Sequence, residues 1–231
     1  MAQRRNRKEK SKQDETIVDL IKTREQAQSF FETNQKMILG VLAAVVIVIA
    51  GYIAYKLLYK APREKQALAQ MYKAEQAFAQ DSTTKALTDA GGGYPGFIDM
   101  VKRYGTTNAG DVANLYAAES YLKEGKYEVA LDYLNDYSGS GKIAEAIKNG
   151  LKGDAYSELG KMDKALSAYK KAAKTDNEFF APYYLFKLGL LNENQGNADA
   201  ALKAYEQIAS DYPNSQQGQS IEAYIARVST K

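Results

Sequence analysis

Residues 149–169, NGLKGDAYSELGKMDKALSAY, are the middle one of three similar stretches in this chain. Residues 114–134 read NLYAAESYLKEGKYEVALDYL, and residues 185–205 read LFKLGLLNENQGNADAALKAY. Four kinds of position recur at steps of 35 and then 36 residues. They are a small residue (Ala118, Gly153 and Gly189), a glycine (Gly125, Gly160 and Gly196), an alanine (Ala130, Ala165 and Ala201) and a bulky residue (Leu134, Tyr169 and Tyr205). A fixed period of this length predicts an array of stacked repeat units.

These positions resemble the tetratricopeptide repeat (TPR), whose unit of about 34 residues carries Leu-Gly, Tyr, Ala, aromatic and Pro positions. The third unit keeps most of the pattern but has Asn192 where a tyrosine is usual. The resemblance implies that the small residues let the two helices of a hairpin approach each other, with Gly125, Gly160 and Gly196 at the turns. We therefore expect an all-α fold, with three TPR-like repeats over residues 111–213 in a right-handed helical-hairpin solenoid.

Such an array needs covered ends, because each hairpin buries its apolar face only against its neighbours. Residues 214–231 are predicted to form a C-terminal capping helix, with apolar residues at helical spacing: Ile221, Tyr224, Ile225 and Val228. Residues 62–104 are expected to supply N-terminal helices that pack on or cap the other end.

Within residues 62–104 the pattern predicts two helices separated by an irregular stretch. The first is expected over residues 63–80, with one apolar face made by Leu68, Met71, Tyr72 and Phe78. The second is expected over residues 97–104. Residues 89–96, DAGGGYPG, are predicted to be a loop, and they lack the Lys-Ser/Thr that a phosphate-binding loop requires.

Toward the N-terminus, residues 37–55, MILGVLAAVVIVIAGYIAY, contain no charged residue. Ten of them are Ile, Leu or Val. At 1.5 Å per residue this run reaches roughly 28 Å, close to the thickness of a bilayer's hydrocarbon core. We predict a transmembrane helix over residues 37–58. The alternatives are a buried core helix and a cleaved signal peptide, whose apolar region is usually shorter.

Residues 1–36 are predicted to be a basic tail followed by an amphipathic helix. The first twelve have no apolar period and are expected to be disordered, either simply solvated or in contact with anionic lipid or ribosomal RNA. From Asp14, a candidate N-cap, apolar residues recur at helical spacing: Ile17, Leu20, Ile21, Ala27, Phe30 and Phe31.

Charge gives the expected orientation. Basic residues close to the apolar run are nearly balanced on its two sides, but the whole tail holds nine Lys or Arg. By the positive-inside rule we expect the tail in the cytoplasm and the repeats on the other side.

A second resemblance runs through the apolar segment, carried by Phe30-Phe31, Asn34, Lys36 and the stretch AQMYKAEQAF at residues 69–78. The chain resembles single-span repeat proteins that accompany the bacterial Sec translocon and periplasmic chaperones, in particular those of Bacteroidota type. This implies an inner-membrane span with a periplasmic TPR domain. It also implies protein partners, namely translocon subunits, chaperones or exported clients.

Composition excludes several function classes. There is no cysteine and no histidine, so disulfides, zinc sites of the usual kind and Ser-His or Cys-His nucleophiles are excluded. Residues 61–231 hold 20 basic and 22 acidic residues, which gives no basis for nucleic-acid binding. We expect no cofactor, no metal site and no enzymatic activity; the composition leaves the oligomeric state open.

The expected partner-binding groove is formed by the first helix of each repeat. Its ten predicted residues are Leu115, Glu119, Leu122, Ile147, Asp154, Ser157, Tyr183, Phe186, Leu190 and Glu193. This mixed apolar and acidic set fits an extended or helical segment of a membrane partner or client. The alternative is that a neighbouring helix, such as the capping one, already covers the apolar positions.

Three functions remain open at this point. One is an accessory role beside the translocon or periplasmic chaperones in protein export and envelope biogenesis. Another is a structural scaffold subunit of a different membrane complex. The third is a cytosol-facing import receptor, which requires the reversed topology.

Overall fold

The computed structural model describes the backbone of residues 2–230 and the side chains of residue 24 and residues 28–230. The chain divides into two compact units, residues 1–59 and residues 60–231. In both, the regular structure is helical apart from one short hairpin.

The first unit is built by α1 (Ala2–Ala54), which is followed by a π-helical turn, η1 (Tyr55–Lys60). The expected start of a helix at Asp14 is wrong, because α1 begins at Ala2 and includes the stretch expected to be disordered. The apolar positions predicted before residue 28 lie outside the described side chains. Helical hydrogen bonding changes register just before Pro62, whose ring cannot donate to an α-helical ladder.

The apolar segment of residues 37–58 has no buried residue. Val48, near its middle, is 70% exposed, so this segment is not a helix of the folded core. By length and composition, one helix among the described residues is long and apolar enough to cross a membrane, within Gln28–Ala79.

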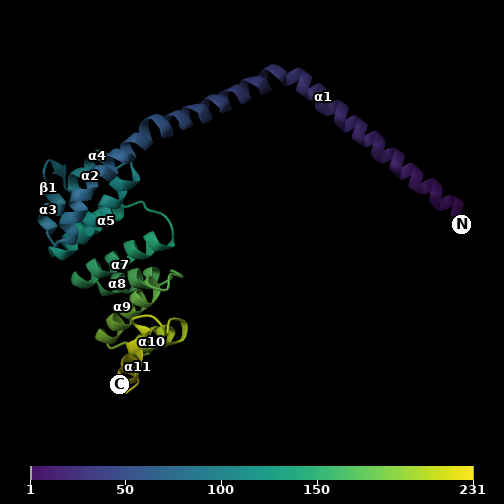
Figure 1. Cartoon of the computed structure of the whole chain (residues 1–231). Coiled ribbons are helices and arrows are strands. Elements are labelled where there is room, and N and C mark those ends of the chain that lie inside the picture. Colours follow the sequence, from purple (N-terminus) through teal and green to yellow (C-terminus); the bar gives the residue numbers. More distant parts are fainter. Residues whose placement is uncertain (1, 231) are drawn as a thin grey trace. The chain divides into compact units, whose positions relative to one another are not determined.

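The second unit is a succession of short helices (Figure 1). In chain order they are α2 (Ala61–Ala79), α3 (Thr83–Thr88), β1 (Asp89–Gly91), β2 (Tyr94–Pro95), α4 (Phe97–Tyr104), α5 (Asn108–Lys123), α6 (Tyr127–Asp136), α7 (Lys142–Glu158), α8 (Met162–Ala172), α9 (Phe180–Asn194), α10 (Ala198–Asp211), the 3-10 turn η2 (Gly218–Ser220) and α11 (Ile221–Ser229). The helix predicted over residues 97–104 is confirmed as α4.

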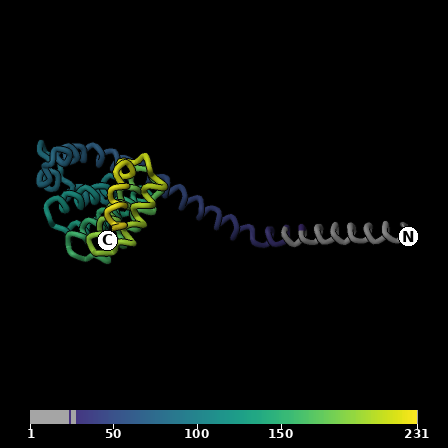
Figure 2. Tube along the Cα trace, turned by 90° about the horizontal axis from the view of Figure 1, so that it is seen from below, coloured from purple at the N-terminus to yellow at the C-terminus, as the bar shows by residue number. Residues whose placement is uncertain are grey.

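Three helical hairpins follow one another: α5 with α6, α7 with α8, and α9 with α10. In Figure 2 the chain from teal to yellow winds through these hairpins as a coiled stack. Each first helix ends at a glycine with positive φ: Gly125 at 73°, Gly160 at 69° and Gly196 at 78°. The residue after each glycine donates to the carbonyl five residues back, at 2.8 to 2.9 Å, which is a Schellman cap. The predicted turn positions are thus confirmed.

Close contact within a hairpin depends on the small residue of the first helix. A Cβ atom added at Gly153 would lie 2.5 Å from the ring of Tyr169, and one added at Gly189 would lie 2.3 Å from the ring of Tyr205. Both tyrosines are buried and come from the second helix of the same hairpin. The repeat positions therefore pair within a hairpin, the glycine making room for the aromatic ring.

The helices before the repeats share one core with α5. It contains Phe97, Met100 and a line of small α2 residues, Ala67, Ala74 and Ala77. Phe97 stacks on Tyr116 of α5 with ring centroids 4.9 Å apart.

The predicted apolar face of the first of these helices is partly wrong. Met71 is buried, but Leu68 and Tyr72 are 56% and 59% exposed. Helix α2 has two apolar stripes, and the one that faces the core is the stripe with alanines, which lets the neighbouring helices come close.

Helix α2 is also tied to α5 by polar contacts. The carboxylate of Glu64 accepts hydrogen bonds from the backbone N–H groups of Asn108 and Ala109, at 2.6 and 2.9 Å. The Thr107 hydroxyl, at the N-cap, accepts from the Gly110 N–H at 3.0 Å. Together these bonds satisfy three of the free N–H groups at the start of α5.

Two further boundaries differ from prediction. Residues 89–96, predicted to be a loop, contain the antiparallel pair β1 and β2, connected through glycines at positive φ. At the other end α11 begins at Ile221 rather than at residue 214. Ile221 and Val228 are buried against α10, as the predicted spacing requires, while Tyr224 and Ile225 are half-buried.

Candidate protein-binding surface

The first helices of the three hairpins, α5, α7 and α9, contact one another in sequence and form what we call the first-helix surface. A close approach between two of them depends on Gly150 of α7. A Cβ atom at that position would lie 2.0 Å from the ring of Tyr184 on α9. The missing side chain therefore lets a ring of one repeat lie directly on the backbone of the preceding one.

All ten residues predicted to line the groove lie on these three helices, and every one is half-buried. Leu115, Glu119 and Leu122 come from α5, and Ile147, Asp154 and Ser157 come from α7. Tyr183, Phe186, Leu190 and Glu193 come from α9. None is fully exposed, so contacts decide which of them are available to a partner.

Some of the apolar members belong to the packing of the array. Leu115 and Leu122 pack against the buried cluster of Ala118, Ala130 and Leu134. Phe186 lies 6.1 Å from Tyr205 and 4.8 Å from Tyr224 of α11, measured between ring centroids. The alternative stated above, that the capping helix covers the apolar positions, therefore holds for Phe186.

Two of the predicted acids are held by their neighbours. Asp154 accepts hydrogen bonds from the Tyr169 hydroxyl at 2.5 Å and from Lys187 Nζ at 2.6 Å. Glu193 accepts from the Tyr205 hydroxyl at 3.1 Å and from Arg227 through Nε at 2.8 Å and Nη2 at 2.7 Å. The same construction thus appears twice: an acid on a first helix, the tyrosine of its own hairpin, and a cation from the next first helix or from the cap.

Sequence reasoning did not find Lys187 and Arg227. They follow their acids by 33 and 34 residues, about one repeat length. That spacing is the signal that could have identified them, because residues one repeat apart face each other in a stack. Lys187 Nζ also lies 5.1 Å from the centroid of the Tyr183 ring, which places the charge at the first-helix surface.

Glu119, by contrast, has no hydrogen bond to another side chain within the described part of the chain. Burial raises the pKa of its carboxyl; Lys123 opposes this rise and the nearby Asp154 adds to it. Tyr116, one turn earlier on α5, has a pKa raised by burial and then by Glu75 and Glu119. Acids and tyrosines of α2, α5 and α7 therefore form one electrostatically linked strip.

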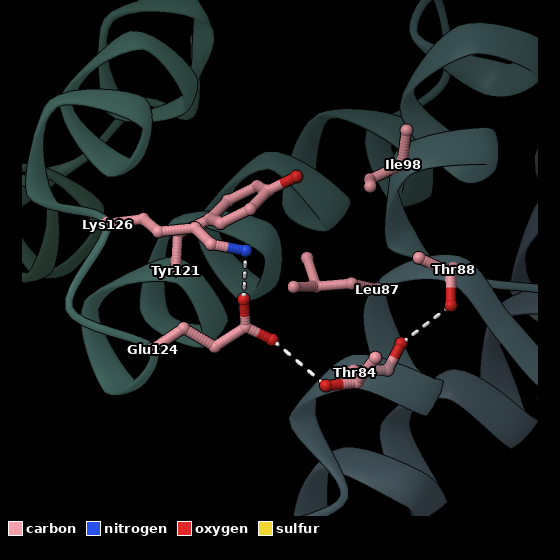
Figure 3. A pocket seen from close by; sticks show the side chains of 7 residues that line it. All are labelled: Thr84, Leu87, Thr88, Ile98, Tyr121, Glu124 and Lys126. Atoms are coloured by element: carbon pink, nitrogen blue, oxygen red, sulfur yellow. Dashed lines mark hydrogen bonds and ion pairs between the residues drawn. The ribbon is translucent and has the colours of Figure 1, made fainter.

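A separate pocket of about 390 Å³ lies between α3, α4 and the end of α5 (Figure 3). Its polar side chains bind one another: Glu124 accepts from Lys126 Nζ at 2.7 Å and from the Thr84 hydroxyl at 3.2 Å. Tyr121 and Leu87 form the apolar wall. Since its charges are already paired, this pocket offers no unmatched group for a charged ligand.

Metal binding has no candidate in the part of the chain that the structure describes, because no cluster of three acidic side chains is placed to hold an ion. The chemistry available on the first-helix surface is that of recognition. It offers half-buried aromatic rings, carboxylates, and the ammonium group of Lys187, which is paired with Asp154.

Comparison with known proteins agrees with this architecture. The family described as tetratricopeptide repeat-like domain matches residues 28–145 and, in a second match, residues 100–193. The chain belongs to the tetratricopeptide repeat-like domain family. A tetratricopeptide repeat also matches residues 183–215, within the third hairpin and the turn after it.

No curated protein matches this member of the tetratricopeptide repeat-like domain family. Among solved structures, a crystal structure of MamA protein is similar, with a TM-score of 0.52 and 17% sequence identity. The similarity covers 71% of this chain and 86% of that one. It shows a shared TPR-like fold. The chain is therefore a helical repeat protein of a kind suited to binding other proteins.

Proposed function

We propose that this chain is a non-enzymatic, membrane-anchored TPR protein that holds a protein partner at the bilayer. The observation that carries the proposal is the apolar segment of residues 37–58, none of which is buried, in the same chain as a folded repeat array. A continuous apolar surface of this length is costly in water and suits the hydrocarbon core of a membrane. The family match begins at residue 28, so the apolar segment belongs to the matched pattern.

The partner is a protein segment bound on the first-helix surface. Tyr183 and Leu190 present apolar area there, and Glu119, which has no hydrogen bond to another described side chain, provides a charge that can select a partner. Because Phe186 packs against α11, it contributes to stability rather than to binding. Tyr183 packs against the buried cluster around Tyr169 but stays half-buried, so its accessible part is the main expected aromatic contact.

The finer assignment is an accessory role beside the bacterial Sec translocon or periplasmic chaperones, with translocon subunits, chaperones or exported clients as partners. It is supported by the resemblance through residues 30–36 and 69–78. It places the protein in the inner membrane as a single-pass protein, with the basic tail in the cytoplasm and the repeats in the periplasm.

The test is photocrosslinking in bacterial cells with the full chain. A photoreactive amino acid replaces Leu190, on the first-helix surface, or Asp132, which is exposed on the second helix α6 and serves as the matched control. We expect crosslinks to translocon subunits, chaperones or exported proteins from position 190 and few from position 132. Equal crosslinking from both positions would remove the first-helix surface from the proposal. A single fixed neighbour from another membrane complex would support the scaffold function instead.

A further inference from the structure

A cleft in the third repeat unit is lined by none of the residues of the predicted groove. It has a volume of about 870 Å³ and is formed by α8, α9 and α10. Leu185, Leu188 and Leu166 supply apolar area, and Tyr212 lines it from the end of α10. Leu185 is buried, whereas Leu166, Leu188 and Tyr212 are half-buried and reachable from solvent.

The cleft arises where repeat positions carry unusually small side chains. Asn192 of the third unit is equivalent to Tyr121 and Tyr156, and Ala204 is equivalent to Tyr133 and Ala168. In the first unit Tyr121 and Tyr133 stack on each other with ring centroids 5.4 Å apart. In the third unit Asn192 and Ala204 both line the cleft instead. The third unit thus lacks two rings that the first unit has.

The charge lining the cleft is positive. Lys170, Lys174 and Lys203 line it and are exposed, and none of them forms an ion pair with any side chain that the structure describes. The acid in the lining, Asp176, is paired with Lys142 at 2.6 Å, and the pKa of Asp176 is lowered mainly by that hydrogen bond. Three cations therefore surround an apolar floor without a matching negative charge.

We propose that this cleft binds an acidic segment of a protein partner, in which an apolar side chain inserts among Leu166, Leu185 and Leu188 while flanking carboxylates pair with the lysines. A cleft with apolar walls and a few charged groups at its edge has the usual build of a binding site. Charge complementarity selects the acidic segment, since carboxylates would pair with lysines that have no partner in the chain. The site is distinct from the first-helix surface, so failure of either proposal leaves the other standing.

The test uses the purified full chain in detergent and an array of short random-sequence peptides. We expect the retained peptides to be enriched in Asp and Glu next to Leu, Ile or Phe. The decisive variant is Asn192→Tyr, which restores the side chain that the other two units carry at this position. It should fill the cleft and abolish retention while leaving the melting temperature equal or higher.

A second pair of variants covers the case in which Asn192→Tyr fails to fold. Lys170→Glu with Lys203→Glu changes only exposed residues and should weaken binding of the retained peptides by about tenfold or more, as expected for losing central contacts. Lys102→Glu, an exposed lysine of α4 outside the cleft, is the matched control and should leave binding within about twofold.

Four outcomes overturn the proposal. The first is that the wild-type chain retains only neutral or basic peptides. The second is that a folded Asn192→Tyr variant, or the double charge reversal, retains peptides as the wild type does.

The third is that short-chain phosphatidylglycerol binds the same lysines and displaces the peptides. The fourth is that the wild-type chain is a dimer and the Asn192→Tyr variant a monomer, because the occupant would then be a second copy of this chain.

Discussion

At the scale of single residues, the array is held by small groups that repeat with the period of the sequence. The hydroxyl of Tyr169 and the ammonium of Lys187 meet on Asp154, and the same arrangement recurs around Glu193. Each group joins two helices of one hairpin to the following element. A residue in such a group therefore contributes both to the stability of its own unit and to the coupling between units.

The turn glycines give the most direct residue-scale prediction. Gly160 has a φ of 69°, and a Cβ atom added there meets no other atom within 4 Å. Gly160→Ala should therefore lower the free energy of unfolding by about 1 kcal/mol, since a left-handed conformation costs an L-residue roughly 1 to 2 kcal/mol. Denaturant unfolding measures this loss of stability. The control is Gly160→Asn, because asparagine tolerates the left-handed conformation better than alanine. Equal losses of stability in the two variants would contradict the explanation.

Glu119 gives a pH-dependent prediction. Because burial raises the pKa of its carboxyl in the folded chain, the folded state holds this proton more tightly than the unfolded state. The contribution of this carboxyl to the free energy of unfolding is therefore fully present at pH values below the ordinary pKa of glutamate. It is lost as the pH rises through the raised pKa of the folded state. Glu119→Gln should raise the melting temperature at neutral pH and change it little in acid. A uniform shift at all pH values would point to packing instead.

At the scale of helices, the repeat period predicted more than local apolar patterns did. The hairpins, their turn glycines and α4 are where the sequence placed them, because the repeat period and the turn glycines can be read directly from the sequence. The apolar face predicted for this helix is partly wrong, since two apolar stripes lie on α2 and only tertiary packing selects the one that faces the core. The partners Lys187 and Arg227 were missed for a similar reason: their roles exist only once the units are stacked.

The register of the second hairpin can be tested at Ala165, which is fully buried beside Tyr169. Ala165→Leu should cost about 1 to 3 kcal/mol by overpacking the α7–α8 contact. Lys171→Leu, an exposed position on the same helix, should change stability by no more than about 0.5 kcal/mol. Thermal unfolding compares the two variants, and an unchanged melting temperature for Ala165→Leu would count against the register.

At the scale of the whole molecule, the proposed membrane anchoring leads to a prediction of topology. Nine basic residues in the first 36 favour a tail that stays in the cytoplasm, so the array would cross. Reporter enzymes that are active only in the periplasm, fused after Lys231, should be active. Activity of cytoplasm-restricted reporters at the same position would reverse the topology and favour the import-receptor function. Fusions after Lys36 give the complementary control.

The carboxylate of Glu64 has a consequence for how the protein bears force. A pull on the N-terminal segment enters the folded unit through α2, and Glu64 is fixed to the first backbone amides of α5. The load therefore passes from α2 to the start of α5 through two short hydrogen bonds, and α3, β1, β2 and α4 lie in the stretch of chain that this bridge encloses. Until the bridge ruptures, tension along the chain bypasses these four elements, which are mechanically shielded.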